Sequence, residues 1–293
     1  MGFLPRTDLA LEERESRGSA DLEGVRFLER DISGYRVSEV IIENEIGSQA
    51  LCKPAGRYIT IELDRLIRRE DSAFEDGARA LASLLSDLLP ENGPVLIAGL
   101  GNPAITPDAV GHIAAKNALV TLHLIDAPGG VFSDLRPVAC VEPGVLGTTG
   151  IESVEVVRAV AEKIRPAAVI AVDALASRRA ERLCRTVQVT DTGIVPGSGV
   201  GNARKELSAN TLGVPVIAVG VPTVVDAATL AVSLAEDCGA RLDEDRLRSA
   251  GGGLIVTPRD IDSKVADISK LVGYGIDLAL QPSLSVSDLD MLI

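Results

Sequence analysis

The chain has very few aromatic residues and no long apolar run. Aromatic residues make up 2% of its 293 residues, and Trp is absent. A core of this size must therefore be built from Ala, Val, Leu and Ile, which is typical of α/β proteins. No apolar run approaches the roughly 20 residues of a membrane-spanning helix, and the N-terminus lacks the apolar core of a signal peptide. We therefore expect a cytoplasmic protein with no membrane partner.

Cysteine and positive charge are also scarce. The chain has four cysteines without CxxC spacing: Cys52, Cys140, Cys184 and Cys238. This scatter favours reduced thiols over a disulfide framework or a zinc site. The formal net charge of −13 disfavours direct binding of nucleic acid through phosphate neutralisation. A protein partner is more compatible with this charge.

The strongest local pattern is the apolar run 95–98, which leads into Gly99 and Gly101. It predicts a buried strand followed by a turn whose backbone comes close to another group, and we expect Gly101 and Asn102 to contact substrate. The next residues, Thr106-Pro107-Asp108, predict a helix start with Thr106 as N-cap. Asp108 would then lie at the carboxyl edge of the sheet, where open α/β folds bind their ligands.

A second buried strand, 167–172, ends at Asp173. In a parallel sheet Asp108 and Asp173 would project at the same edge and could meet. Two adjacent carboxylates do not both ionise easily, so one keeps a proton while the other acts as a base, which suits amide hydrolysis by an activated water. Two alternatives stay open at this point. The aspartates could be ordinary helix caps or exposed strand ends, or they could bind a metal together with His112 or His123.

The loop 196–202 is too rich in glycine for ordinary packing. Its residues Gly197, Ser198 and Gly199 could offer backbone N–H groups to an anion, or let a substrate peptide approach. The loop lacks the lysine of a P-loop and the strand-to-helix setting of a dinucleotide site. It therefore keeps two other functions open: a small-molecule hydrolase or phosphorylase with an anion site here, and a protein-binding module without catalysis.

Apolar runs alternate with helical periodicity along the chain, which predicts a single α/β domain with a doubly wound, mostly parallel sheet flanked by helices. Residues 1–24 are charged and without a sustained period, so we expect an arm, and residues 237–253 are predicted to be a short excursion from the core. Further strands are expected at 37–42, 58–63, 119–125, 138–141, 187–191 and 214–219, and helices at 78–89, 152–164 and 261–280.

Several different short motifs are distributed from the N-terminus to the last third of the chain. They are Arg6-Thr7-Asp8-Leu9-Ala10, Gly56-Arg57-Tyr58, Gly99-Leu100-Gly101-Asn102, Thr106-Pro107-Asp108-Ala109, Pro143-Gly144-Val145, Thr149-Gly150-Ile151-Glu152, Val172-Asp173-Ala174-Leu175-Ala176, Pro196-Gly197-Ser198-Gly199-Val200-Gly201-Asn202 and Pro222-Thr223-Val224-Val225-Asp226. At these motifs the chain resembles the germination protease family, the endopeptidases of spore-forming bacteria that degrade small acid-soluble spore proteins. The stretch 99–111 is also similar to the opening of the hydrogenase-maturation endopeptidases, whose α/β fold the family shares.

The resemblance implies an aspartic-type endopeptidase with Asp108 and Asp173 as its functional aspartates and without a cofactor or metal. It implies a homotetramer in the spore core that cuts DNA-binding spore proteins during germination and need not bind DNA itself. It also implies a zymogen. The run 7–12 is similar to the family's substrate pattern, so we expect self-cleavage between Asp8 and Leu9, which would remove a propeptide of residues 1–8 and leave a single domain of residues 9–293. The chain is shorter than other members around 237–253.

Overall fold

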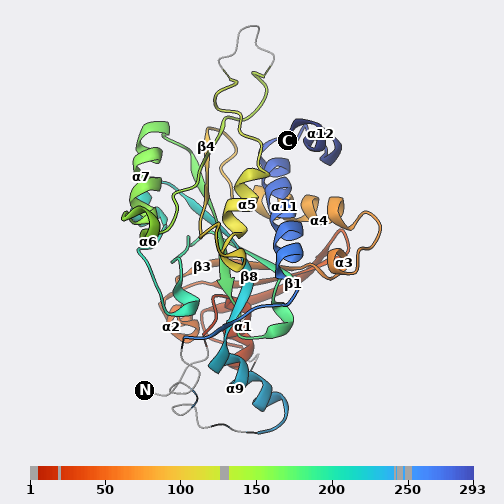
Figure 1. Cartoon of the computed structure of the whole chain (residues 1–293), viewed down its shortest axis with the longest axis vertical. Helices are drawn as coiled ribbons and strands as arrows, with labels where there is room; N and C mark the ends of the chain where they lie inside the picture. The colour runs from red at the N-terminus through yellow and green to blue at the C-terminus, as the bar shows by residue number, and fades with distance from the viewer. Residues whose placement is uncertain (1–5, 19–20, 126–131, 241, 243–246, 248–252) are drawn as a thin grey trace.

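The computed structural model describes residues 6–18, 21–125, 132–240, 242, 247 and 253–293 (Figure 1). The described strands form one sheet in the order β1-β2-β3-β7-β8-β6-β4-β5, with β9 paired to β8. They are β1 (Val25–Ile32), β2 (Tyr35–Ile42), β3 (Gly56–Glu62), β4 (Val95–Gly99), β5 (Val138–Val141), β6 (Ala168–Ala176), β7 (Thr186–Thr190), β8 (Val216–Asp226) and β9 (Ile255–Val256). Helices cover both faces, so the expected single-domain α/β architecture is confirmed.

The described α-helices are α1 (Ala10–Ser16), α2 (Glu45–Leu51), α3 (Asp64–Ile67), α4 (Ala73–Ser86), α5 (Val110–Lys116), α6 (Leu146–Thr149), α7 (Ser153–Ile164), α8 (Ala209–Leu212), α9 (Ala227–Asp237), α11 (Ile261–Leu280) and α12 (Val286–Leu292). Short 3₁₀ turns are η1 (Thr106–Asp108), η2 (Ala180–Arg182) and η3 (Ser198–Val200). None of these described helices is long and apolar enough to cross a membrane.

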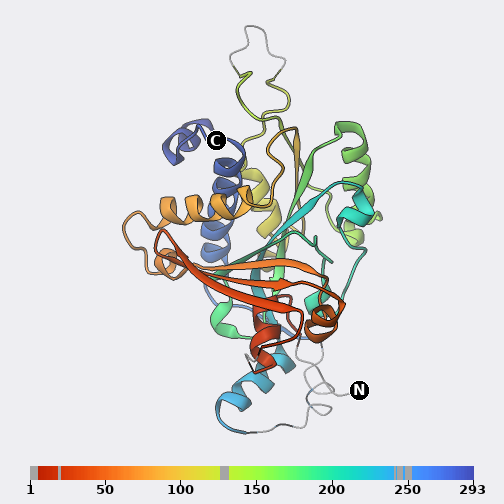
Figure 2. The same ribbon diagram turned by 180° about the vertical axis from the view of Figure 1, so that it is seen from behind.

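The sheet is mixed, and its two halves differ in strand direction. Strands β8, β6, β4 and β5 pair in parallel, whereas β1, β2, β3, β7 and β8 pair antiparallel. The antiparallel half begins with a tight hairpin, because Ser33 and Gly34 both have positive φ between β1 and β2. Figure 2 shows these red and orange strands with α1 beside them. The parallel half brings the carboxyl ends of β4 and β6 to the same edge of the sheet.

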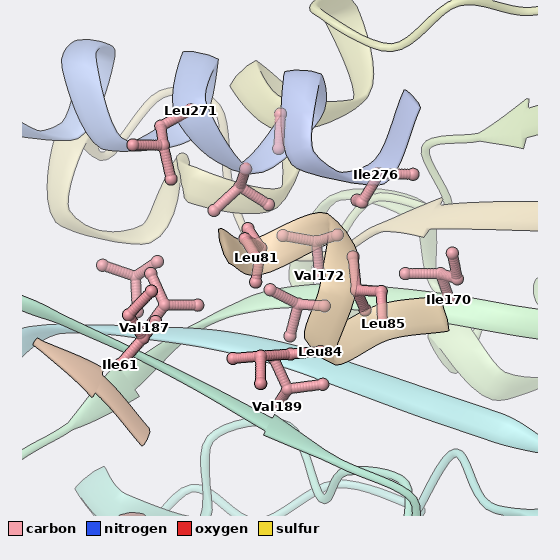
Figure 3. Close-up of a cluster of buried hydrophobic side chains, with 14 of the residues drawn as sticks. Ile61, Leu81, Leu84, Leu85, Ile170, Val172, Val187, Val189, Leu271 and Ile276 are labelled. Carbon is pink, nitrogen blue, oxygen red and sulfur yellow. The ribbon is translucent and has the colours of Figure 1, made fainter. Parts of the chain in front are cut away.

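The largest core cluster lies between the sheet and the helices α4, α5 and α11 (Figure 3). Leu81, Leu84 and Leu85 of α4 are fully buried in it. They lie among Ile170 and Val172 of β6, Val187 and Val189 of β7, and Leu271 and Ile276 of α11. On the opposite face, α7 packs on β4, β6 and β8 in a second cluster. The predicted helices 152–164 and 261–280 correspond to α7 and α11, so both predictions are confirmed.

The N-terminal segment is packed against the sheet, so the prediction of an arm is wrong for residues 9–16. Leu9 and Ala10 are 0% exposed, and α1 shares a core cluster with β2, β3 and α2. The carboxylate of Glu12 is buried as well and accepts hydrogen bonds from the backbone N–H groups of Arg178 and Arg179. Because this segment is rich in charged residues, its sequence did not indicate a short helix with one apolar side. Residues 1–5 lie outside the described residues.

The strand expected at 119–125 is also wrong, because this segment forms turns. Its backbone N–H groups do not form the hydrogen bonds of a β-ladder. Leu119 N donates to the carboxyl group of Asp277, and Thr121 N and Leu122 N both donate to Val138 O. Strand β8 continues past Gly220 to Asp226, further than expected. The predicted excursion at 237–253 falls largely outside the described residues.

Candidate active site

Asp108 is held by the turn that follows β4. Leu100 N donates to Val172 O at 2.8 Å, and the chain then reverses at Gly101, which has φ of 97°. A Cβ atom at Gly101 would lie 2.0 Å from Asp108 O, so only glycine fits. The expected cap is wrong: Thr106 caps no helix, and Asp108 lies in the 3₁₀ turn η1 before α5. Its Oδ2 accepts a hydrogen bond of 2.9 Å from Asn102 N.

Asp173 lies within β6, and its side chain is on the face of the sheet that carries α7. It is 4% exposed, and its Oδ1 accepts a hydrogen bond of 2.9 Å from Ala174 N. The two aspartates line the same cavity of about 580 Å³, together with Gly101, Asn102, Gly197 and Gly199. Ser198 lines an adjoining cavity of about 410 Å³. The structure therefore brings together the site residues predicted from separate parts of the sequence.

The two aspartates have different electrostatic surroundings. Burial raises the pKa of Asp173 well above its ordinary value, and the negative charges of Asp108 and Asp8 raise it further. Burial also raises the pKa of Asp108, but the N–H group of Asn102 opposes this shift by stabilising the carboxylate. Deeper burial and the nearby negative charges thus favour a proton on Asp173 over one on Asp108, although Ala174 N–H opposes the shift of the Asp173 pKa.

Asp8, which the sequence indicates as part of the processing site, lines the same cavity. Its N–H donates to Ala176 O at 2.9 Å, and its Oδ2 accepts from Ala176 N at 2.8 Å. Its Oδ1 accepts a hydrogen bond of 2.6 Å from Ser198 Oγ. The N-terminal segment is therefore joined to the end of β6 and to the glycine-rich loop, next to the two aspartates.

Gln188 holds the peptide groups on either side of Leu9. Its Nε2 donates to Asp8 O at 3.2 Å, and its Oε1 accepts from Ala10 N at 2.9 Å. Both Gln188 and Asp173 pair with Gly220 of β8, so the two side chains lie on the same face, about 10 Å apart across two strand spacings. Sequence reasoning missed Gln188. The alternation in 186–190 could have found it, because it places this glutamine opposite the apolar face of Val187 and Val189.

Neither histidine lines the cavity of the two aspartates. His112 Nδ1 contacts a carboxyl oxygen of Glu142. Within the part of the chain that the structure describes, no three His, Cys, Asp or Glu side chains come together as a metal site would require. The four cysteines are all free, so the expectation of unpaired thiols is confirmed.

Comparison with known proteins gives the family of this chain. The model of the family described as germination protease matches residues 5–235, which include Asp8, Asp108 and Asp173. The chain belongs to the germination protease family. The germination protease of Caldanaerobacter subterraneus subsp. tengcongensis is 40% identical to it, over 98% of each chain. That of Bacillus subtilis is 36% identical, over 97% of this chain and 95% of the relative.

As a member of the germination protease family, the protein is a peptide-bond hydrolase. Among solved structures it is similar to the [NiFe] hydrogenase maturation protease HycI from Thermococcus kodakarensis. That similarity has a TM-score of 0.34 at 15% identity, and it covers 66% of this chain and 98% of the other.

Proposed function

We propose that this protease is an endopeptidase in which Asp108 and Asp173 form the acid–base pair. The observation that carries the proposal is that both carboxyl groups face one cavity in unequal surroundings. The Asp108 carboxylate takes a proton from a water molecule, whose oxygen attacks the carbonyl carbon of the substrate. Asp173 gives its proton to the amide nitrogen as the C–N bond breaks. No cofactor takes part in this scheme.

The protein is made as a zymogen that cuts its own bond between Asp8 and Leu9. Three contacts support this part of the proposal: Asp8 lies in the cavity of the two aspartates, Gln188 donates to the carbonyl oxygen of that bond, and it accepts from the N–H of Ala10. Release of residues 1–8 would clear Asp8 from the cavity.

The substrates are small acid-soluble DNA-binding proteins of the spore, and the enzyme acts on them in the spore core during germination as a homotetramer. Membership of the germination protease family supports this role. The formal net charge of −13 agrees with an enzyme that binds the protein component rather than the DNA.

The test is incubation of the purified protein with a small acid-soluble spore protein, followed by mass analysis of the products. Asp108→Asn and Asp173→Asn should each lower the rate by about 10²-fold or more, as loss of a general acid or base does. The matched control is Asp262→Asn, at an exposed position in the first turn of α11, which should retain the wild-type rate. Circular dichroism checks that each variant is folded.

A variant of either aspartate that retained more than about a tenth of the wild-type rate would remove that residue from the mechanism. Absence of any cleavage, before or after loss of residues 1–8, would overturn the proposed function itself.

Exhaustive chelation provides an independent test of the pair. If the aspartates exchange protons with water directly, the chelated enzyme should retain its activity. If they act as metal ligands, chelation should abolish activity and a divalent ion should restore it. The second result would contradict the proposal.

A further inference from the structure

The glycine-rich loop binds a carboxylate of its own chain, that of Asp8. The carboxylate of Asp8 lies between Ala176 at the end of β6 and the loop residues Ser198 and Gly199. A Cβ atom at Gly199 would lie 2.2 Å from Asp8 Oδ2 and 2.5 Å from Ala176 Cβ. The glycine at this position therefore leaves the space that the carboxylate fills.

We propose that the N–H of Ala176, the hydroxyl of Ser198 and the space at Gly199 form the subsite for the acidic side chain immediately before the cut bond. In the uncut chain Asp8 occupies this subsite as the first substrate. The inference rests on the proposed function, since it takes Asp8–Leu9 as the bond that is cut. It adds the residues that select an acid at that position.

The chemistry of the subsite favours a carboxylate over an amide of the same shape. Both of its groups, Ala176 N–H and Ser198 O–H, donate to the Asp8 carboxylate. A carboxylate accepts at both oxygens. An amide would place its oxygen toward Ala176 N–H and its NH₂ toward Ser198 Oγ, which can also accept, so the two ligands differ in charge rather than in shape. Charge-assisted hydrogen bonds are also stronger than neutral ones. The selection thus depends on the charge of the group held by two hydrogen bonds, one from the buried Ala176 and one from the exposed Ser198.

The same contacts fix the position of the cut bond. Ala176 binds residue 8 twice, because its O accepts the main-chain N–H of Asp8 and its N donates to the Asp8 side chain. An acidic residue held at both points presents its own carbonyl group toward Gln188, as Asp8 does. The same contacts therefore recognise the acidic side chain and position the bond that follows it.

Asp8 also closes the subsite to other peptides. The two cavities, of about 580 and about 410 Å³, share Asp8, Leu175 and Gly199 in their walls. Asp8 thus divides what would otherwise be a continuous groove along the end of β6. A separate substrate can place its acidic side chain between Ala176 and Ser198 only after Asp8 has left.

The first test needs no catalysis. In the full chain carrying Asp8→Gly, the missing side chain has the size of acetate, so acetate should bind in its place and acetamide should bind more weakly. The readout is the saturable shift of the Ala176 and Gly199 amide signals in NMR spectra. Adding Ser198→Ala should weaken acetate binding about tenfold or more, the typical effect of losing a hydrogen bond to a charged group, whereas Ser86→Ala, whose hydroxyl donates to Ala82 O within α4, should not. Equal binding of acetate and acetamide, or no shift at Ala176, would overturn the subsite.

The second test measures specificity with the processed protein and peptides of sequence 3–16 that carry Asp, Asn or Ala at position 8. The variant Ser198→Ala should lower kcat/KM for the Asp peptide by about tenfold or more and leave the Ala peptide nearly unchanged. An equal loss for all three peptides would overturn the inference. If the wild type cut none of them, the proposed function would fail, and the acetate titration would still decide whether the subsite exists.

Discussion

At the scale of single residues, two aspartates of the same chemistry lie in different surroundings. Asp173 lies inside a strand, largely removed from water, where its charged form is costly. Asp108 lies in a turn and is only half-buried, and each of the two carboxyl groups accepts one backbone N–H, from Asn102 and Ala174 respectively. In the mechanism we propose, this difference makes Asp173 the proton donor and Asp108 the base.

This division predicts a bell-shaped pH dependence of kcat/KM. Activity should fall as the pH rises through the raised pKa of Asp173, because its proton is lost, and should fall at low pH as Asp108 becomes protonated. The measurement is kcat/KM of the processed enzyme over the stable pH range, with the peptide's own acid titrated separately. A rate that keeps rising with pH would contradict the assignment of Asp173 as the acid.

A second buried carboxyl group, Asp277 of α11, makes a prediction about stability. Burial raises its pKa to about 8, although its oxygens accept hydrogen bonds of 2.9 and 3.0 Å from Leu119 N. This folded-state pKa lies above the ordinary value of about 3.9, so folding favours the protonated form of Asp277. The contribution of this group to the free energy of unfolding is therefore full below about pH 4 and is lost as the pH rises through about 8. The loss amounts to about 1.4 kcal/mol for each unit of pKa difference.

The variant Asp277→Asn does not titrate at this position, so its melting temperature should fall less than that of the wild type between about pH 5 and about pH 9. The exposed Asp262→Asn should follow the wild type. Parallel melting curves for the wild type and Asp277→Asn would show that Asp277 is not protonated in the folded state.

At the scale of elements, the sequence predicts what depends on local pattern. The helices α7 and α11 and the strands β4 and β6 follow from periodicity and apolar runs, and the rule for parallel strands placed Asp108 and Asp173 at one edge. The helix α1 could not be predicted in this way, since its stability comes from contacts with β2, β3 and residues near 178. The segment 119–125 is apolar like a strand but lacks a strand partner among the described residues, and its N–H groups bind Asp277 and Val138 instead.

The contact between α5 and β6 makes a prediction at this scale. A Cβ atom at Gly111 would lie 2.2 Å from Val172 O and 2.4 Å from Leu100 N, so Gly111→Ala must push α5 away from the strand that carries Asp173. We expect a loss of about 1–3 kcal/mol in the free energy of unfolding, measured by urea denaturation. The control is Gly147→Ala, where a Cβ atom meets nothing within 4 Å. A Gly111→Ala variant as stable as the wild type would contradict this packing.

At the scale of the whole molecule, the site joins residues that are far apart in sequence. Asp8 binds Ala176 and Ser198, at sequence separations of 168 and 190 residues. The family's substrate pattern pointed to the bond after Asp8, but no local pattern could place that residue beside Asp173. Its position follows from the packing of α1 on the sheet, and it places the Asp8 side chain in the wall of the cavity that the two aspartates line.

This arrangement predicts that self-cleavage occurs within one molecule. Because Asp8 already occupies the cavity of its own chain, the fraction cut after a given time should not depend on protein concentration. A rate that rises in proportion to concentration would instead indicate that one molecule cuts another.

The most direct test of the aspartate pair is the intact mass of the full chain after incubation at mildly acidic pH, because the raised pKa of Asp173 favours its protonated form there. The wild type should lose residues 1–8 and begin at Leu9, while Asp108→Asn and Asp173→Asn should keep the full mass. A wild-type chain that stays whole, or trimming at this bond that persists in both variants, would contradict the account.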